Sequence, residues 1–285
     1  MAVIIPVFND QHGLLSCLGG LGAQTYPTDK IEIIVVDNGS TPTLDPPERY
    51  PLTVRIVCCE KPGSYSARNA GARVASGDIL AFTDADCIPD PEWLSKGVAA
   101  LLAGDGKSII GGQVLFAQSA ARSGTALYQQ AIGFQQEENI QHKGFTVTAN
   151  MFCTAKQFRA VGPFNERLLS GGDLEWCWRA GRQGITVHFE PHAEVQTTPR
   201  IRLRDAVRQA RRVAAGRVHL RGHDFSHPVV LERYRTLTQS IIWTMSLSNF
   251  STWERIRILA AGAIIRLFAA LENVKLRFGS AAERR

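Results

Sequence analysis

Residues 79–90, ILAFTDADCIPD, decide the expected fold, because an apolar run ends abruptly in two carboxylates. The four residues ILAF are typical of a short buried strand. Asp84 follows that strand, and Asp86 lies one residue further on. Such a pair fits a solvated turn, but at the end of a buried strand it can also face one divalent cation, one carboxylate directly and one through water. Pro89 and Pro91 are expected to stop the chain soon afterwards.

Three earlier apolar runs have the same character, and helical patterns separate them. The runs are AVIIPV (2–7), IEIIVVD (31–37) and TVRIVC (53–58), and helices are expected at residues 10–23 and 65–75. Strands separated by helices predict a parallel sheet with right-handed crossovers. Since ligands bind beyond the carboxyl ends of such strands, we expect Asn9, Asp37 and Asp84 to converge on one crevice.

The rest of the chain is less regular and then becomes helical. Strands are expected at residues 108–116, 145–153 and 185–190, and helices at 122–141, at 173–183 and from Leu203 onward. We therefore expect an α/β domain over residues 1–200 and a basic helical extension over residues 201–285.

The composition is that of an ordinary globular protein. Of 285 residues, 45% are hydrophobic and 20% are charged, which argues against a disordered or fibrous chain. The net charge is +6, and eight arginines fall between Arg200 and Arg221, so we expect an anionic partner at one face and no nucleic acid.

Six cysteines without metal-binding spacing favour free thiols in a cytoplasmic protein. Residues 236–253 are uncharged but rich in hydroxyl and amide groups, so no membrane-spanning helix is expected.

Four stretches taken together resemble family 2 glycosyltransferases with the GT-A fold of nucleotide-diphospho-sugar transferases. They are IIPVFND (4–10), IIVVDNGS (33–40), KPGSYSARNAGARVASGDILAFTDADCIPDPEWL (61–94) and SGGDLEWCWRAGRQG (170–184). Their joint order and spacing are more specific than any single motif. The resemblance implies an α/β fold with a mostly parallel sheet flanked by helices, and transfer of a sugar from a nucleotide diphosphate to an acceptor with inversion.

The resemblance also implies a donor site. It assigns Pro6, Phe8, Asn9 and Asp37 to the base and ribose, Arg68 and Asn69 to the diphosphate, and Asp84 and Asp86 to base, ribose and a divalent cation, Mg²⁺ or Mn²⁺. Asp37 can accept the imide N–H of a uracil, which favours a UDP-linked donor, although a loop or cap acid also fits. Arg68 follows a Gly-Ser loop and suits a diphosphate, although a surface arginine also fits.

Asp173 begins a predicted helix after a Ser-Gly-Gly turn. An acid in a first turn can simply complement the helix dipole. The resemblance instead implies that Asp173 is the catalytic base that takes the proton of the acceptor hydroxyl. Glu175, Trp176 and Arg179 follow it and are the expected acceptor contacts.

Three positions depart from the family pattern. Gly172 stands where the first acid of a Glu-Asp pair is common, and Thr197 stands where a metal-binding histidine usually ends a strand. Residues 209–213 echo the QxxRW motif of processive members without its tryptophan, which argues against polymer synthesis. The first two departures also fit a second hypothesis, a nucleotide-sugar-binding protein without turnover.

A third hypothesis is a protein that acts mainly at a membrane surface. A helical wheel puts seven apolar residues on one stripe, flanked by basic residues: Ile256, Ala260, Ala263, Ile264, Leu267, Leu271 and Val274. The pattern predicts binding to an anionic membrane, on the inner face of the cytoplasmic membrane, with a glycan or lipid-linked acceptor. A helix packed on the catalytic domain fits the same stripe.

Overall fold

The computed structural model describes residues 1–45, 50, 52–117, 122–221 and 236–278. The chain divides into two compact units. The first comprises Met1–Leu115, Phe134–Arg167 and Gly172–Thr197, and the second comprises Phe116–Gly133, Leu168–Gly171 and Thr198–Arg285. Residues 222–235, which the sequence predicts to be helical, lie outside the described residues.

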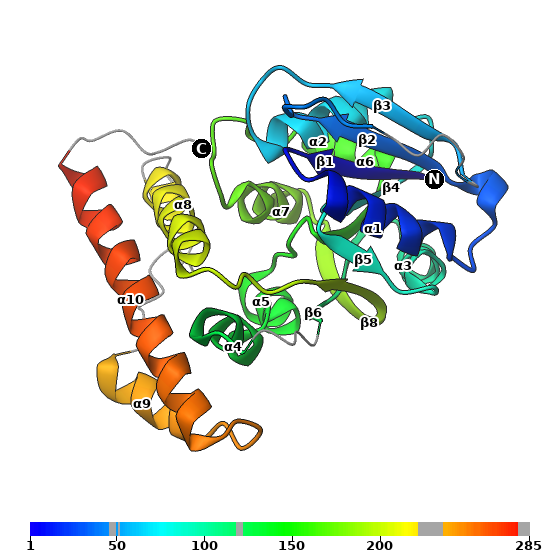
Figure 1. Ribbon diagram of the computed structural model, residues 1–285. Helices are drawn as coiled ribbons and strands as arrows, with labels where there is room; N and C mark the ends of the chain where they lie inside the picture. Colours follow the sequence, from blue (N-terminus) through cyan, green and yellow to red (C-terminus); the bar gives the residue numbers. More distant parts are fainter. Residues whose placement is uncertain (46–49, 51, 118–121, 222–235, 279–285) are drawn as a thin grey trace. The chain divides into compact units, whose positions relative to one another are not determined.

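A mixed sheet of eight strands, in the order β3-β2-β1-β4-β7-β6-β8-β5, forms the centre of the first unit (Figure 1). In sheet order the strands are β3 (Val54–Cys58), β2 (Glu32–Asp37), β1 (Ala2–Val7), β4 (Ile79–Thr83), β7 (Asn150–Thr154), β6 (Ser108–Phe116), β8 (Thr186–Thr197) and β5 (Cys87–Pro89). The first four run parallel, whereas β7 pairs antiparallel with β4 and β6, and β5 pairs antiparallel with β8. The expected α/β fold is confirmed, and the parallel part lies in its N-terminal half.

Helices cover this sheet and supply its crossovers. They are α1 (Gln11–Gly22), the short 3-10 helix η1 (Thr28–Lys30), α2 (Ser64–Val74), α3 (Trp93–Ala103), α5 (Gln136–Lys143), α6 (Ala155–Val161) and α7 (Gly172–Arg182). Asp10 fixes the start of α1 by accepting the backbone N–H of Gly13 at 2.9 Å, and thereby satisfies one of the donors that the first turn leaves unpaired.

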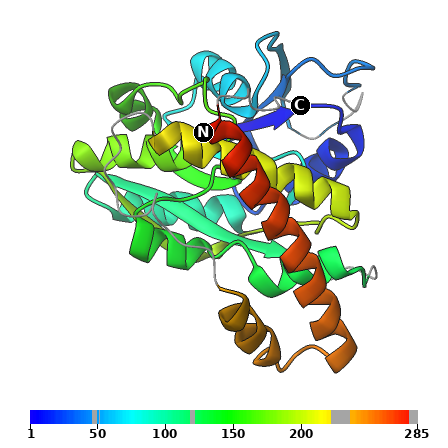
Figure 2. The same ribbon diagram turned by 90° about the vertical axis from the view of Figure 1, so that its left-hand side faces the viewer.

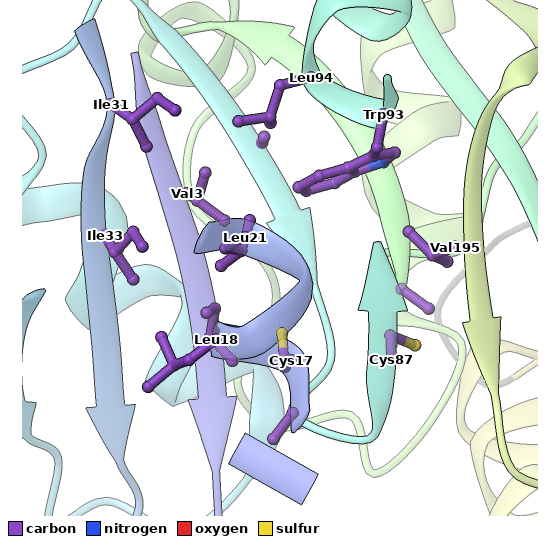
Figure 3. Close-up of a cluster of buried hydrophobic side chains, with 14 of the residues drawn as sticks. Val3, Cys17, Leu18, Leu21, Ile31, Ile33, Cys87, Trp93, Leu94 and Val195 are labelled. Carbon is purple, nitrogen blue, oxygen red and sulfur yellow. The ribbon is translucent and has the colours of Figure 1, made fainter. Parts of the chain in front are cut away.

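The core forms because the strands are apolar on both faces. Val3 of β1 and Ile33 of β2 are fully buried against Leu18 and Leu21 of α1 (Figure 3). Burial of each such side chain contributes about 1.5–3 kcal/mol. Trp93 extends the same core at the start of α3, where its indole N–H donates to Oδ1 of Asn150 at 2.9 Å.

The structure differs from the prediction in four places. A short strand and a helix that were not expected follow the acidic motif: β5 ends at Pro89, and α3 begins at Trp93, because a proline is tolerated just before the first turn of a helix. The expected helix at 122–141 is two helices, since Gly133 takes a left-handed φ of 65° between them. The strand expected at 145–153 begins only at Asn150. The strand expected at 185–190 continues to Thr197 as β8.

The second unit is helical, and it contains residues 116–133 and 168–171 of the predicted α/β domain as well as the C-terminal extension. Its helices are α4 (Gly124–Ile132), α8 (Leu203–Arg221), α9 (Leu237–Met245) and α10 (Thr252–Arg277). The long helix α10 packs against the other three (Figure 1, Figure 2). Arg211 of α8 donates to Glu272 of α10 at 2.8 Å, and Glu272 is buried there. Among the described helices, none is long and apolar enough to cross a membrane.

Candidate active site

The carboxyl ends of neighbouring parallel strands meet at one edge of the sheet (Figure 1). Asp37 is the last residue of β2 and lies in register with Val7 of β1. Ile4 of β1 pairs with Phe82 of β4, so that Asp84 follows β4 at the same edge. The strand order therefore brings both carboxylates to the edge where ligands bind in such sheets.

The turn after β1 is fastened to the turn after β2 through Asn9. The backbone N–H of Asn9 donates to the hydroxyl of Ser40 at 2.9 Å, and the backbone N–H of Thr41 donates to the Asn9 side chain at 2.8 Å. Asn9 has a φ of 53°, a left-handed conformation that asparagine tolerates better than most residues. Pro6 is half-buried in β1, whereas the Phe8 ring is exposed at this edge.

Asn38 organises the same edge, although no sequence motif singled it out. Its backbone N–H donates to the carbonyl of Val7 at 2.8 Å. Its side-chain amide donates to the carbonyls of Cys59 at 2.9 Å and Lys61 at 2.8 Å and accepts from Gly63 at 2.7 Å. Asn38 thus ties the ends of β1 and β3 to the loop that begins α2. Its position between Asp37, at the end of a predicted strand, and Gly39 is the sequence feature that could have indicated this role.

Arg68 on α2 points a buried guanidinium at the first acid of the Asp-Ala-Asp motif. The guanidinium forms an ion pair with Asp84, and the arginine is only 4% exposed. It also lies over the ring of Tyr65, 5.7 Å from the ring centroid. Its Nε atom has no hydrogen-bond partner among the described residues. The guanidinium therefore has one buried donor that no described residue satisfies.

The second acid of the motif lies beside the end of β8. Asp86 is exposed, and the next residue, Cys87, pairs in antiparallel register with Thr197. The position where the family pattern has a metal-binding histidine therefore lies next to the acidic motif. The oxygens of Asp84, Asp86 and Thr197 are hard donors, which suits Mg²⁺ or Mn²⁺. Within the described part of the chain, no three His, Cys, Asp or Glu side chains form a cluster that could hold a metal.

Asp173 lies in the first turn of α7 and contacts a tyrosine of α2. The Tyr65 hydroxyl accepts the backbone N–H of Gly172 at 2.8 Å and lies 3.3 Å from Oδ1 of Asp173, to which it donates. Burial raises the pKa of the Asp173 carboxyl above its usual range, while a backbone hydrogen bond from Leu174 and the charge of Arg68 act in the opposite sense. A carboxylate with a raised pKa is a better proton acceptor.

Asn69 has a different environment from its neighbour Arg68. Its amide nitrogen donates to the carbonyl of Phe164 and to Glu166, both at 2.9 Å, and its oxygen accepts the backbone N–H of Phe164 at 2.9 Å. Glu166 also forms an ion pair with Lys61. The Asn69 side chain thus fixes the segment after α6, and this packing favours a structural role over direct contact with a diphosphate.

The three expected acceptor contacts on α7 are also engaged within the protein. Glu175 is buried and forms an ion pair with Arg179, whose guanidinium also donates to the backbone carbonyls of Val161, at the end of α6, and of Pro163. Trp176 is fully buried, donates to the carbonyl of Gly162 at 2.8 Å and stacks on Phe158. These contacts hold α7 in place and favour a structural role for all three. A contact between them and an acceptor remains a prediction.

The sequence comparison decides the family. The model of glycosyl transferase family 2 matches residues 2–160, more than half of the chain. The chain belongs to glycosyl transferase family 2. It is 34% identical over 225 residues to the glycosyltransferase AglE of Haloferax volcanii, covering 77% of this chain and 73% of that protein. It is 28% identical over 217 residues to the pre-mycofactocin glycosyltransferase of Mycobacterium tuberculosis, covering 72% of this chain and 44% of that protein.

Solved structures agree with the GT-A fold of this family 2 enzyme. The mannosyltransferase PcManGT from Pyrobaculum calidifontis, in complex with GDP-Man and Mn²⁺, has a TM-score of 0.60 at 18% identity, with 97% of this chain and 79% of that chain covered. S. aureus TarS 1-349 in complex with UDP-GlcNAc has a TM-score of 0.52 at 16% identity, with 99% and 93% covered. At these identities the likeness concerns the fold alone.

Proposed function

We propose that this glycosyltransferase moves a sugar from a UDP-linked donor to an acceptor hydroxyl, with inversion at the anomeric carbon. The observation that carries the proposal is a continuous set of contacts from Asp84 through Arg68 and Tyr65 to Asp173. These contacts join the carboxylate expected at the metal to the carboxylate expected at the acceptor. Transfer needs both, because the leaving diphosphate gains charge while the acceptor loses a proton.

The nucleotide would bind across the ends of β1, β2 and β4. Asp37 is buried, and its Oδ1 accepts the backbone N–H of Ser40 at 2.9 Å, which leaves lone pairs for the imide N–H of uracil. The exposed ring of Phe8 offers a face on which the base can pack, and Pro6 and Asn9 shape the same turn. Arg68 would bind the diphosphate through its guanidinium.

A divalent cation, Mg²⁺ or Mn²⁺, would be held by Asp84 and Asp86 together with oxygens of the donor diphosphate. When bound, it neutralises charge on the departing diphosphate. Asp84 is half-buried, whereas Asp86 is exposed, so Asp86 is the more accessible of the two ligands. Thr197, beside Cys87, offers a hydroxyl where the family pattern has an imidazole. Since few protein ligands are present, metal affinity should depend on bound nucleotide.

Asp173 would accept the proton as the acceptor oxygen attacks the anomeric carbon. The new carbon–oxygen bond forms on the face opposite the bond to the diphosphate, which breaks and carries its electron pair away with the nucleotide. The raised pKa of Asp173 supports this role, because proton transfer is most effective when the pKa of the base approaches the working pH.

A donor screen tests the proposal. Purified protein is incubated with UDP-sugars, GDP-mannose and other nucleotide sugars, with Mn²⁺ or with chelator, and release of the free nucleotide is measured. Metal-dependent release of UDP supports the proposal. Binding of a nucleotide sugar without turnover, with candidate acceptors present, would favour instead the nucleotide-sugar-binding protein that Gly172 and Thr197 also fit.

The acceptor would be a glycan or a lipid-linked hydroxyl, presented at the inner face of the cytoplasmic membrane. The apolar stripe of α10 supports this location. Its side chains are exposed in the described structure, whereas the opposite side of α10 packs within the second unit. The large exposed side chains of the stripe are Ile256, Ile264, Leu267, Leu271 and Val274. Ile242 and Met245 of α9 and Trp253 at the start of α10 are exposed as well.

The charges of α10 favour a lipid surface over a second protein chain. Both of its acids are engaged: Glu254 with Arg122 and Glu272 with Arg211. The basic residue Lys275 is exposed beside the stripe. An apolar face edged by cations matches an anionic bilayer, where side chains enter the interface and cations remain at the headgroups. Flotation with anionic vesicles at low salt should carry the protein upward, and failure to float would contradict this location.

A further inference from the structure

Gly172, which replaces an acid common in this family, lies against a tyrosine ring. A Cβ atom built on Gly172 would lie 2.7 Å from the Cε2 and Cζ atoms of Tyr65, far closer than carbon atoms approach. Tyr65 is buried, with Phe164 at a ring-centroid distance of 5.8 Å and Arg68 over its face. Phe164 and Arg68 flank the ring, which occupies the position that a side chain at 172 would need.

The hydroxyl of this ring also makes hydrogen bonds to the first turn of α7. It accepts the backbone N–H of Gly172 at 2.8 Å and lies 3.4 Å from the backbone N of Asp173. Both donors belong to the first turn of α7, which has no earlier helical carbonyl to bind. The same hydroxyl donates its own proton to Oδ1 of Asp173. One phenol group therefore fixes both the backbone and the carboxylate of the proposed base.

We propose that Tyr65 is a positioning residue for Asp173 and that it forms a matched pair with Gly172. The inference rests on the proposed role of Asp173 as the base. The tyrosine hydroxyl aims one carboxylate oxygen and leaves the other for the acceptor. It also links the base to Arg68, and through Arg68 to Asp84, so that the acceptor side and the donor side of the site share one rigid support.

Tyr65→Phe is the direct test, because it removes the hydroxyl and keeps the ring. Without the hydroxyl the carboxylate is less well oriented, and we expect kcat to fall about tenfold, the scale of one lost hydrogen bond to a charged group. The pKa of Asp173 should rise further, since a donor to its charged form is gone while burial remains. The acidic limb of the rate profile should therefore move to higher pH.

Among the described residues, the charged and titratable groups that act on Asp173 lie on α2 and on α7 itself. Arg68 and Tyr65 face it from α2, and the Cys177 thiol interacts with it electrostatically within α7. Arg68 remains in the Tyr65→Phe variant, so the shift of the acidic limb reports on the hydroxyl. Tyr26→Phe is the matched control, because Tyr26 precedes β2 at the opposite edge of the sheet, and it should leave kcat and the profile unchanged.

A second pair of variants tests whether Gly172 and Tyr65 depend on each other. Gly172→Ala should lower kcat because its methyl group displaces the Tyr65 ring. In a Tyr65→Ser background the ring is absent, so the same change should have little further effect, a strongly non-additive result. Additive losses would overturn the pairing.

The outcomes separate this inference from the proposed base. If Asp173→Asn keeps near-normal transfer, the base assignment fails, and the role of Tyr65 fails with it. If Asp173→Asn loses transfer while Tyr65→Phe keeps both kcat and the wild-type acidic limb, the base assignment stands and the positioning role of Tyr65 is wrong.

Discussion

Arg68 and Asp84 form an ion pair whose two sides differ in exposure: the arginine side chain is 5% exposed and the aspartate side chain is 36% exposed. The cation is therefore fixed by the protein, while the carboxylate opens toward the edge of the sheet where the strands end. This arrangement lets one carboxylate orient a buried guanidinium and still present an oxygen to a ligand.

Arg68→Lys keeps the charge but removes the planar fork. A lysine cannot reproduce the geometry with Asp84 and the position over Tyr65 together. We expect the Kd for the nucleotide-sugar donor to rise about tenfold or more, the scale of one lost charge-assisted hydrogen bond. Calorimetric titration with donor measures it. An unchanged Kd would show that the guanidinium does not bind the diphosphate.

Asp86→Ala should separate metal use from folding. Asp86 is exposed, so its removal should leave the unfolding midpoint unchanged. Metal-dependent donor binding should weaken strongly, because Asp86 is the more accessible of the two proposed ligands.

Calorimetry with MnCl₂ on the wild-type protein should show tight binding only when nucleotide is present. Tight Mn²⁺ binding to the nucleotide-free protein would contradict the incomplete protein ligand set.

Asn38→Ala should destabilise the sheet edge without removing a proposed ligand group. The change breaks three side-chain hydrogen bonds that join the ends of β2 and β3 to the start of α2. We expect the free energy of unfolding to fall by about 3 kcal/mol, measured by urea denaturation. Asn273→Ala on α10 is the control and should change it by less than about 0.5 kcal/mol. Equal effects would argue against the organising role of Asn38.

Two glutamates on the exposed side of α10 should abolish vesicle binding. Leu267 and Leu271 are 57% and 53% exposed, so Leu267→Glu with Leu271→Glu should not disturb folding. The charges oppose insertion into an anionic interface. Flotation should fall to background, whereas Leu102→Glu, on an exposed leucine of α3, should float like wild type. Retained flotation of the double variant would place the membrane contact elsewhere.

The sequence predicted the parallel part of the fold well because its signals are local. AVIIPV, IEIIVVD and TVRIVC are continuous apolar runs, and they form β1, β2 and β3 within one residue of the expected ends. The antiparallel pairing of β7 with β4 was not predictable in this way, since it joins Asn150 to Thr83 across more than sixty residues. Contacts of that kind depend on the whole fold rather than on periodicity.

The residues of the candidate site also differ in how far the sequence alone could place them. Asp37 and Asp84 could be placed from the sequence, because Asp37 ends and Asp84 directly follows a buried strand that neighbours β1. The matching of Tyr65 to Gly172 could not, because it depends on how α2 packs against the start of α7. The missing acid at 172 appeared only as a departure from the family pattern, and the ring that fills its place became visible only in three dimensions.

The role of Asp173 as the base is tested most directly by measuring both the transfer rate and the donor affinity of Asp173→Asn. Asparagine keeps the shape of the side chain but cannot accept the proton of the acceptor. We expect kcat to fall about 10²–10⁴-fold while the Kd for the donor barely changes, because donor binding is assigned to Asp37, Arg68 and Asp84. Near-normal transfer by Asp173→Asn would contradict that role.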